Sequence, residues 1–196
     1  MTHYFTDNRQ LAHNRKEISF RFLGVSYTFI TDSGVFAKDK VDTGSAILLK
    51  ALVNEPLTGT LLDYGCGYGV LGIVLAKQFA LEVTGVDVNE RALSLTKENA
   101  EKNQVLIETI LNSGSLLLNQ RFSNIVMNPP IRAGKQIIYQ MFAESYELLK
   151  ENGTLYIVMR KQHGAESAIK ELNKNYTNVE VIYREKGFLV IKSKKA

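Results

Sequence analysis

Three polar segments of this sequence have residue types and spacings that could do chemistry. The first is Asp63-Tyr64-Gly65-Cys66-Gly67-Tyr68-Gly69, between two apolar runs. Its alternating glycines allow unusual backbone dihedrals and let a ligand lie against main-chain N–H groups at a helix N-terminus. The acid before them would repel a bare phosphate, so it suits a ligand that carries an ammonium group or hydroxyls. Cys66 is expected to be a small buried filler rather than a nucleophile.

The second segment is Asp87-Val88-Asn89, which also follows an apolar run. Asp87 lies 20 residues after Gly67, where dinucleotide-binding folds place an acid that accepts ribose hydroxyls. A carboxylate suits the ribose of any adenosine ligand. Because Gly67-x-Gly69-x-x-Gly72 also satisfies the dinucleotide fingerprint, an NAD-linked oxidoreductase stays an alternative; the position of Asp63 and the third segment weigh against it.

The third segment is Asn128-Pro129-Pro130. Proline has no N–H donor and a fixed φ, so the Pro129 carbonyl can stay unpaired beside the amide oxygen of Asn128. Two acceptors that face one point would hold an exocyclic amino group and turn its lone pair towards an electrophile. A helix-breaking turn alone would explain the prolines but would not require the asparagine.

Alternating strand and helix patterns place all three segments at strand ends. The expected class is α/β: a Rossmann-like, doubly wound, mostly parallel sheet with a C-terminal antiparallel hairpin and a small N-terminal β-hairpin appendage. We divide the chain into an arm and hairpin appendage at 1–41 and a main domain at 42–196. Strands are expected at 60–64, 82–86, 106–111, 122–127 and 154–159, and helices at 69–79, 90–103, 134–150 and 164–175.

Composition narrows the function class. The chain has 196 residues, 45% hydrophobic and 22% charged, with one cysteine, no apparent signal peptide and no run long enough to cross a bilayer. We expect a cytoplasmic protein with no metal site, since its three histidines are scattered. Residues 150–196 carry ten basic against five acidic side chains, which suits a polyanionic partner, although an ordinary solvated surface is nearly as good an explanation.

Together the three segments resemble the class I S-adenosylmethionine-dependent methyltransferases, in particular their Asn-Pro-Pro branch, which acts on exocyclic or amide nitrogens. The phrases at 34–45 and 128–135 are similar to the catalytic half of RsmC-like enzymes, the guanine-N2 methyltransferases of small-subunit (16S) ribosomal RNA. The resemblance runs from about residue 17 to the C-terminus.

The resemblance implies a role for each site residue. Asn128, Pro129 and Pro130 would form the catalytic clamp on the target amino group. In the cofactor site, Asp87 would bind the ribose and Val88 the adenine face, and the other expected cofactor residues are Asp63, Gly65, Cys66, Gly67, Asn112, Ser113, Asp42, Thr43 and Gly44. Ile131 cannot stack on a base as the aromatic residue of many relatives does, so the base would be packed by aliphatic contact or by Tyr4, Phe5 or Phe36.

The implied substrate is ribosomal RNA or the small ribosomal subunit. Expected substrate-binding residues are Phe36, Ile131, Arg132, Lys135, Arg160 and Lys161. The same clamp would hold a protein glutamine amide, which is the main alternative substrate, and a non-catalytic RNA-binding module is a third possibility. Some relatives carry a second copy of the domain that helps bind RNA, and this chain is expected to lack that copy. We expect the protein to act as a monomer or a homodimer.

Overall fold

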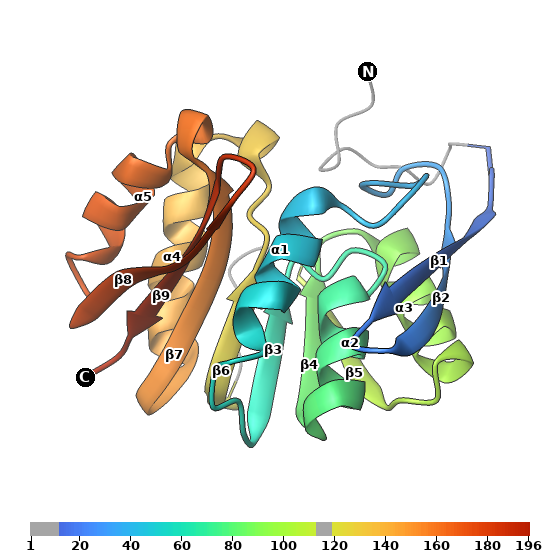
Figure 1. Cartoon of the computed structure of the whole chain (residues 1–196), viewed down its shortest axis with the longest axis horizontal. Coiled ribbons are helices and arrows are strands. Elements are labelled where there is room, and N and C mark those ends of the chain that lie inside the picture. Colours follow the sequence, from blue (N-terminus) through green and yellow to red (C-terminus); the bar gives the residue numbers. More distant parts are fainter. Residues whose placement is uncertain (1–11, 113–118) are drawn as a thin grey trace.

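The computed structural model describes residues 12–112 and 119–196. Its main element is a seven-stranded sheet with the order β5-β4-β3-β6-β7-β9-β8 (Figure 1). Five neighbouring strands are parallel, whereas β9 runs antiparallel to both β7 and β8. The strands are β3 (Thr60–Tyr64), β4 (Glu82–Asp87), β5 (Ile107–Leu111), β6 (Phe122–Met127), β7 (Leu149–Arg160), β8 (Asn178–Glu185) and β9 (Phe188–Lys194).

Helices cover both faces of the sheet (Figure 1). Helices α1 (Thr43–Leu52), α2 (Val70–Phe79) and α3 (Glu90–Lys102) lie on one face, and α4 (Lys135–Leu148) and α5 (Ala165–Leu172) lie on the other. Two short 3₁₀ turns, η2 (Ile131–Ala133) and η3 (Lys161–His163), precede α4 and α5. Each face has its own apolar core: Leu48 and Val74 belong to the first, Ile138 and Ala168 to the second.

An N-terminal hairpin, β1 (Lys16–Phe22) and β2 (Val25–Thr31), packs its buried Tyr27 and Phe29 into the first of these cores. Two asparagines of α3 hold β2 by its backbone. The side chain of Asn99 accepts from the Ile30 N–H at 2.6 Å and donates to the Ile30 carbonyl at 3.0 Å. One helical turn later, Asn103 makes the equivalent pair of bonds with Thr28 at 3.1 and 2.8 Å. The amides thus take the place of a neighbouring strand.

The predicted fold class is confirmed, with both hairpins where they were expected. Most element boundaries agree within one or two residues. The exceptions are α5, which ends at Leu172 rather than at 175, and β7, which begins at Leu149 rather than at 154 because residues at its start pair with the beginning of β6 across an irregularity in register. Within the described ranges, no helix is both long and apolar enough to cross a membrane. The division at residue 41 stays a prediction.

Candidate active site

The site lies where the order of the strands reverses. From β3 the chain moves outwards to β4 and β5, and then returns to the other side of β3 as β6. At such a switch point in a parallel sheet, the loops after the two adjacent strands diverge and leave a crevice for a ligand. The loops concerned are the glycine turn, Asp63 to Gly69, and Asn128-Pro129-Pro130. Topology thus brings together two segments that are about 60 residues apart in the chain.

The backbone of the glycine turn is fixed by its neighbours. The N–H groups of Gly65 and Cys66 donate to the carbonyl of Val86 at 2.8 and 3.0 Å, and Gly69 begins α2 with a φ of 93°. A Cβ atom on Gly69 would lie 2.9 Å from Ile73 and 3.0 Å from Thr96, so any other residue would strain the backbone and force these side chains to move. Burial raises the pKa of Cys66 well above its usual value, which disfavours the thiolate and agrees with the filler role.

Asp63 is almost completely buried beneath this turn. One carboxylate oxygen accepts from the N–H of Gly72, in the first turn of α2, at 2.8 Å. The other oxygen has no hydrogen-bond partner among the described residues. Burial, helped by the charge of nearby Asp87 and opposed by the Gly72 bond, raises the pKa of Asp63 to about 7. Two adjacent acids, one with an unsatisfied oxygen, fit a cationic ligand such as the ammonium and sulfonium groups of S-adenosylmethionine.

Asp87, at the end of β4, is hydrogen-bonded to the backbone of the glycine turn. Its two oxygens accept from the N–H groups of Gly67 and Asn89 at 2.8 and 2.9 Å, and the side chain is only 2% exposed. Val88 beside it is 41% exposed, which leaves an apolar surface for a flat ring. Asn112 follows β5 and donates its backbone N–H to the Asp87 carbonyl at 2.9 Å. The ribose and adenine roles of these residues stay predictions, and Ser113 lies outside the described residues.

Asn128 is held on one side only. Its amide nitrogen donates to Asp42 at 2.8 Å and to the hydroxyl of Ser45 at 3.0 Å. Among the described residues, neither the amide oxygen of Asn128 nor the carbonyl of Pro129 accepts a hydrogen bond. Both acceptors that the sequence places in this turn therefore keep their capacity for a donor, as a clamp on an amino group requires.

The loop between β2 and α1 is fastened to the same region. The amide nitrogen of Asn89 donates to the Gly34 carbonyl at 3.0 Å, and the Tyr68 hydroxyl donates to the Ala37 carbonyl at 3.3 Å. Phe36, between these two anchors, is 57% exposed and has no aromatic partner among the described residues. It is therefore available for contact with a ligand. Tyr4 and Phe5, the other aromatic candidates, lie outside the described residues.

The four predicted cationic contacts are all exposed on the edge that carries the 3₁₀ turns. The aliphatic chain of Lys135 passes within 3.9 Å of the position that a Cβ on Gly164 would take, so the starts of α4 and α5 adjoin. Lys161 forms a loose ion pair with Glu166 at 3.8 Å. Arg160 lies over the ring of Phe188, 4.6 Å from its centroid.

Phe188 is a site residue that the sequence did not reveal. Its ring touches the position of a Cβ on Gly44 at 3.2 Å, and that same position lies 3.5 Å from the Asn128 amide nitrogen. Phe188 therefore connects Arg160 to the clamp. The register that puts Phe188 opposite Arg160 comes from the antiparallel pairing of β9 with β7. No local sequence signal specifies that pairing, because the hairpin pattern alone does not say which strand it joins.

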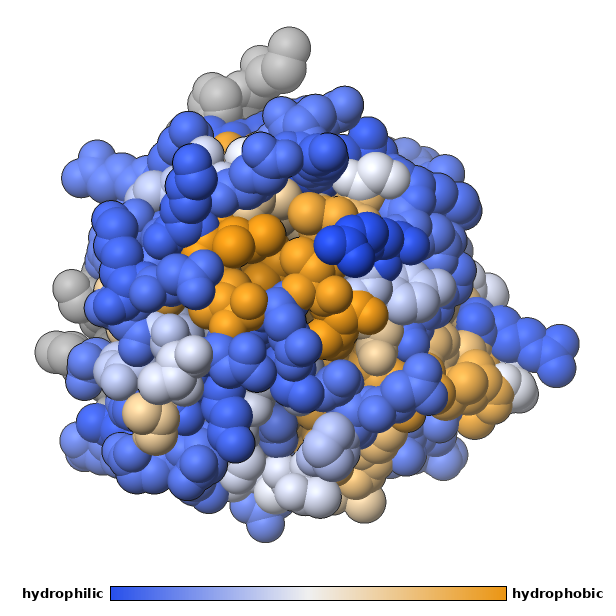
Figure 2. All heavy atoms as spheres, turned by 60° about the vertical axis from the view of Figure 1, so that its left-hand side comes forward, coloured by the Kyte–Doolittle hydropathy of each residue, from blue (hydrophilic) through white to orange (hydrophobic). Residues whose placement is uncertain are grey.

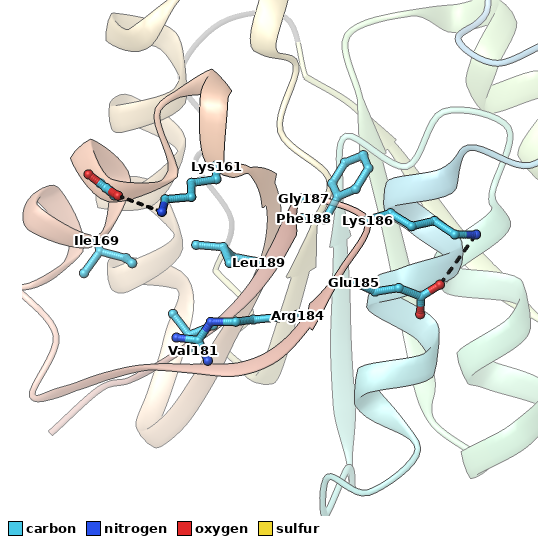
Figure 3. Close-up of a pocket in the computed structure, with 10 residues that line it drawn as sticks. Lys161, Ile169, Val181, Arg184, Glu185, Lys186, Gly187, Phe188 and Leu189 are labelled. Carbon is cyan, nitrogen blue, oxygen red and sulfur yellow. Dashed lines mark ion pairs between the residues drawn. The ribbon is translucent and has the colours of Figure 1, made fainter.

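A groove of about 500 Å³ lies on the outer side of Phe188, between α5 and the β8–β9 hairpin (Figure 3). Its apolar lining comes from Ile169, Val181 and Leu189, and Lys161 and Arg184 stand at its margin. Figure 2 shows a continuous apolar surface on this side of the molecule. The groove adjoins the clamp through Phe188 but contains none of the residues of the glycine turn. The part of the chain that the structure describes contains no group of three or more potential metal ligands.

Comparison with known proteins agrees with this geometry. A protein of Bacillus subtilis (strain 168) called uncharacterized protein YbxB is 41% identical over 98% of both chains. The ribosomal RNA small subunit methyltransferase C of Colwellia psychrerythraea is 31% identical over 87% of this chain and 48% of its own length. The present chain thus spans about half the length of this relative.

Among solved structures, the 16S rRNA N2 G1207 methyltransferase (RsmC) of T. thermophilus, in complex with AdoMet and guanosine, superposes with a TM-score of 0.84 at 26% identity. The match covers 93% of this chain and 51% of that one. The sequence model of the methyltransferase small domain matches residues 26–192. These findings confirm the prediction of an S-adenosylmethionine-dependent methyltransferase and remove the oxidoreductase alternative. The chain belongs to the methyltransferase small domain family.

Proposed function

We propose that this enzyme transfers a methyl group to the exocyclic 2-amino group of a guanine in small-subunit ribosomal RNA. The observation that carries the proposal is a pair of acceptors beside the glycine turn, the Asn128 amide oxygen and the Pro129 carbonyl, to which none of the described residues donates. A group held there must be a donor of two protons, and the 2-amino group of guanine is such a donor. The RsmC relatives, which are named as methyltransferases of 16S or small-subunit rRNA, support the choice of RNA.

The residues of this chain would act mainly by positioning. Asn128 and Pro129 would accept the two amino protons, so that the nitrogen lone pair points at the methyl group. Bound S-adenosylmethionine would supply that methyl group from its sulfonium centre and leave as S-adenosylhomocysteine, and the methylated nitrogen would lose one proton. Asp63 and the glycine turn would fix the amino-acid end of the cofactor. Holding two reactants near attack geometry can lower a barrier by roughly 7–11 kcal/mol, so no covalent intermediate is needed.

RNA binding would use the exposed cationic edge. Arg132, Lys135, Arg160 and Lys161 would contact phosphates, and Phe36 and Ile131 would pack on the target base. A base inside a helical stack cannot reach the clamp, so the target guanine must be unpaired or flipped out. An RNA substrate of this kind also implies that the enzyme works in the cytoplasm, as we expect from the composition.

The test uses labelled S-adenosylmethionine with small ribosomal subunits, and with deproteinised RNA, from cells that lack this protein. Nucleoside mass spectrometry should detect N2-methylguanosine. Asn128→Ala should lower the rate by about 100-fold or more, the usual cost of losing one preorganised hydrogen-bonding group at a reacting centre. Asn175→Ala, the same change at an exposed residue beyond α5, is the matched control. If the cofactor binds but no RNA is labelled, the RNA proposal fails, and a protein glutamine amide becomes the next substrate to assay.

A further inference from the structure

We infer that Asp42 is a positioning residue for the clamp, and that it fixes which end of the Asn128 amide faces the substrate. This inference rests on the proposed role of Asn128. Asp42 precedes α1 and is 86 residues away from Asn128 in the chain, yet its Oδ2 atom accepts from Asn128 Nδ2 at 2.8 Å. The resemblance implied a different role for Asp42, as one of the residues of the cofactor site.

The orientation follows from the chemistry of the two side chains. An asparagine amide has a donor end and an acceptor end of nearly the same shape, and the two can exchange by rotation. A carboxylate can only accept, so the atom that faces Asp42 has to be the nitrogen. The second proton of that nitrogen goes to the hydroxyl of Ser45 at 3.0 Å. Both donors of Asn128 are then used, and only its oxygen is left for the substrate.

This arrangement selects the substrate as well as orienting it. A clamp whose only exposed polar atoms are acceptors binds an amino group and rejects a carbonyl. In guanine, the 2-amino group is the donor of this kind, whereas the O6 and N7 atoms are acceptors. The carboxylate also polarises the amide, which makes its oxygen a stronger acceptor as positive charge develops on the attacking nitrogen.

Helix α1 holds Asp42 in place. The same Oδ2 atom accepts from the N–H of Ser45 at 3.1 Å, so Asp42 is also the N-cap of α1. Gly44 leaves room for the contact, because a Cβ there would lie 2.9 Å from Oδ2. One oxygen atom thus joins the start of a helix to the clamp, and the rigid helix sets the position of the amide.

Asp42→Asn is the most informative variant. Asparagine is as good an N-cap as aspartate, so α1 should keep its cap. The new amide can present either end to Asn128, however, so the orientation of Asn128 is no longer forced. We expect kcat to fall by about 10- to 100-fold, the usual effect of losing a group that orients an active-site residue. The Kd for S-adenosylmethionine, measured by calorimetry, should stay within twofold of wild type.

Two further variants complete the kinetic test. Ser45→Ala should reduce kcat in the same way but less, since Asp42 alone still fixes the amide, and Ser45→Thr should restore it because threonine keeps the hydroxyl. Asp39→Asn is the matched control: it removes one acidic charge from the same loop at an exposed residue that pairs with Lys16, and should leave both constants unchanged. If Asp42→Asn weakens cofactor binding tenfold while kcat at saturation is unchanged, Asp42 is a cofactor ligand and the inference is wrong.

A measurement without turnover separates this inference from the choice of substrate. The side-chain NH₂ signals of Asn128 can be identified in ¹⁵N NMR spectra by their loss in Asn128→Asp. In the wild type both protons should be hydrogen-bonded and shifted downfield, and Asp42→Asn should move them whereas Asp39→Asn does not. Unmoved signals in Asp42→Asn would overturn the inference, even if RNA is the substrate. Moved signals would uphold it, even if the enzyme turns out to methylate a protein amide.

Discussion

Buried Asp63 should make the protein less stable as the pH rises from about 4 to about 7. In the unfolded chain its carboxyl group has the ordinary pKa of 3.8, whereas in the folded protein burial raises that pKa to about 7. Between these values the folded state binds a proton that the unfolded state has released, so the free energy of unfolding falls as pH rises. Each pKa unit is worth about 1.4 kcal/mol, so the total loss from this residue is about 4 kcal/mol by pH 8.

The assay compares wild type with Asp63→Asn by urea denaturation at pH 4 to 8. Asparagine cannot ionise, and its amide oxygen can still accept from the N–H of Gly72, so the variant keeps that hydrogen bond but lacks the titration. The difference between the two unfolding free energies isolates Asp63 from all other titrating groups, including Asp32, whose pKa is held below its usual range by His13 and nearby backbone N–H groups against the effect of burial. We expect this difference to shift in favour of the variant by about 4 kcal/mol from pH 4 to pH 8.

A difference that does not change with pH would refute the reasoning, because it would mean that Asp63 has the same pKa in both states. Binding of the cofactor should lower the pKa of Asp63 again. A cation bound beside Asp63 would favour the carboxylate, so binding at pH 6 should release a proton, and calorimetry in buffers of different ionisation enthalpy measures that release.

Three further predictions concern single contacts. Gly69→Ala should destabilise the fold by more than about 2 kcal/mol, from positive φ plus contact with Ile73 and Thr96; Gly24→Ala, also at positive φ but in open space, should cost less, and equal melting temperatures would contradict this. Asn103→Ala should cost about 2–3 kcal/mol in urea denaturation, because two backbone groups of Thr28 lose their partners; a change below about 1 kcal/mol would show that water replaces the amide. Lys135→Ala should weaken RNA binding and reduce the salt dependence of the affinity by about one phosphate contact. Lys170→Ala, on the exposed face of α5, should change neither. If both variants show the same salt dependence, Lys135 does not contact the RNA.

The strand ends of the site could be predicted because their signals are local. Glycines that need positive φ, an acid after a buried strand and two consecutive prolines each report on a few neighbouring residues. Strand–helix alternation then fixes the parallel sheet, and a parallel sheet brings the carboxyl ends of its strands to one edge. The positions of Asp63, Asp87 and Asn128 on that edge follow without any knowledge of side-chain packing.

The contacts between distant segments could not be predicted in this way. Nothing near Asp42 indicates a bond to Asn128, and nothing near Phe188 indicates contact with Gly44, because these pairs depend on how α1 and β9 pack against the sheet. The burial of Asp63 could not be predicted either. An acid after a strand suggested a ligand contact, but the pKa of Asp63 is raised by burial that only the assembled core provides. Sequence thus predicted which residues lie at this edge of the sheet, whereas their contacts with distant segments required the structure.

The hydrogen bonds that join α3 to the N-terminal hairpin have a consequence for the order of folding. The bonds of Asn99 and Asn103 to Ile30 and Thr28 close loops of 69 and 75 residues. During synthesis the hairpin therefore leaves the ribosome long before its partner helix exists, and the rings of Tyr27 and Phe29 have no core to enter. Asn99 also donates to the carbonyl of Tyr68 at 2.9 Å, within the glycine turn. We therefore expect the glycine turn to reach its final geometry only after α3 has formed, so that docking of the hairpin and completion of the candidate site become one late, shared step.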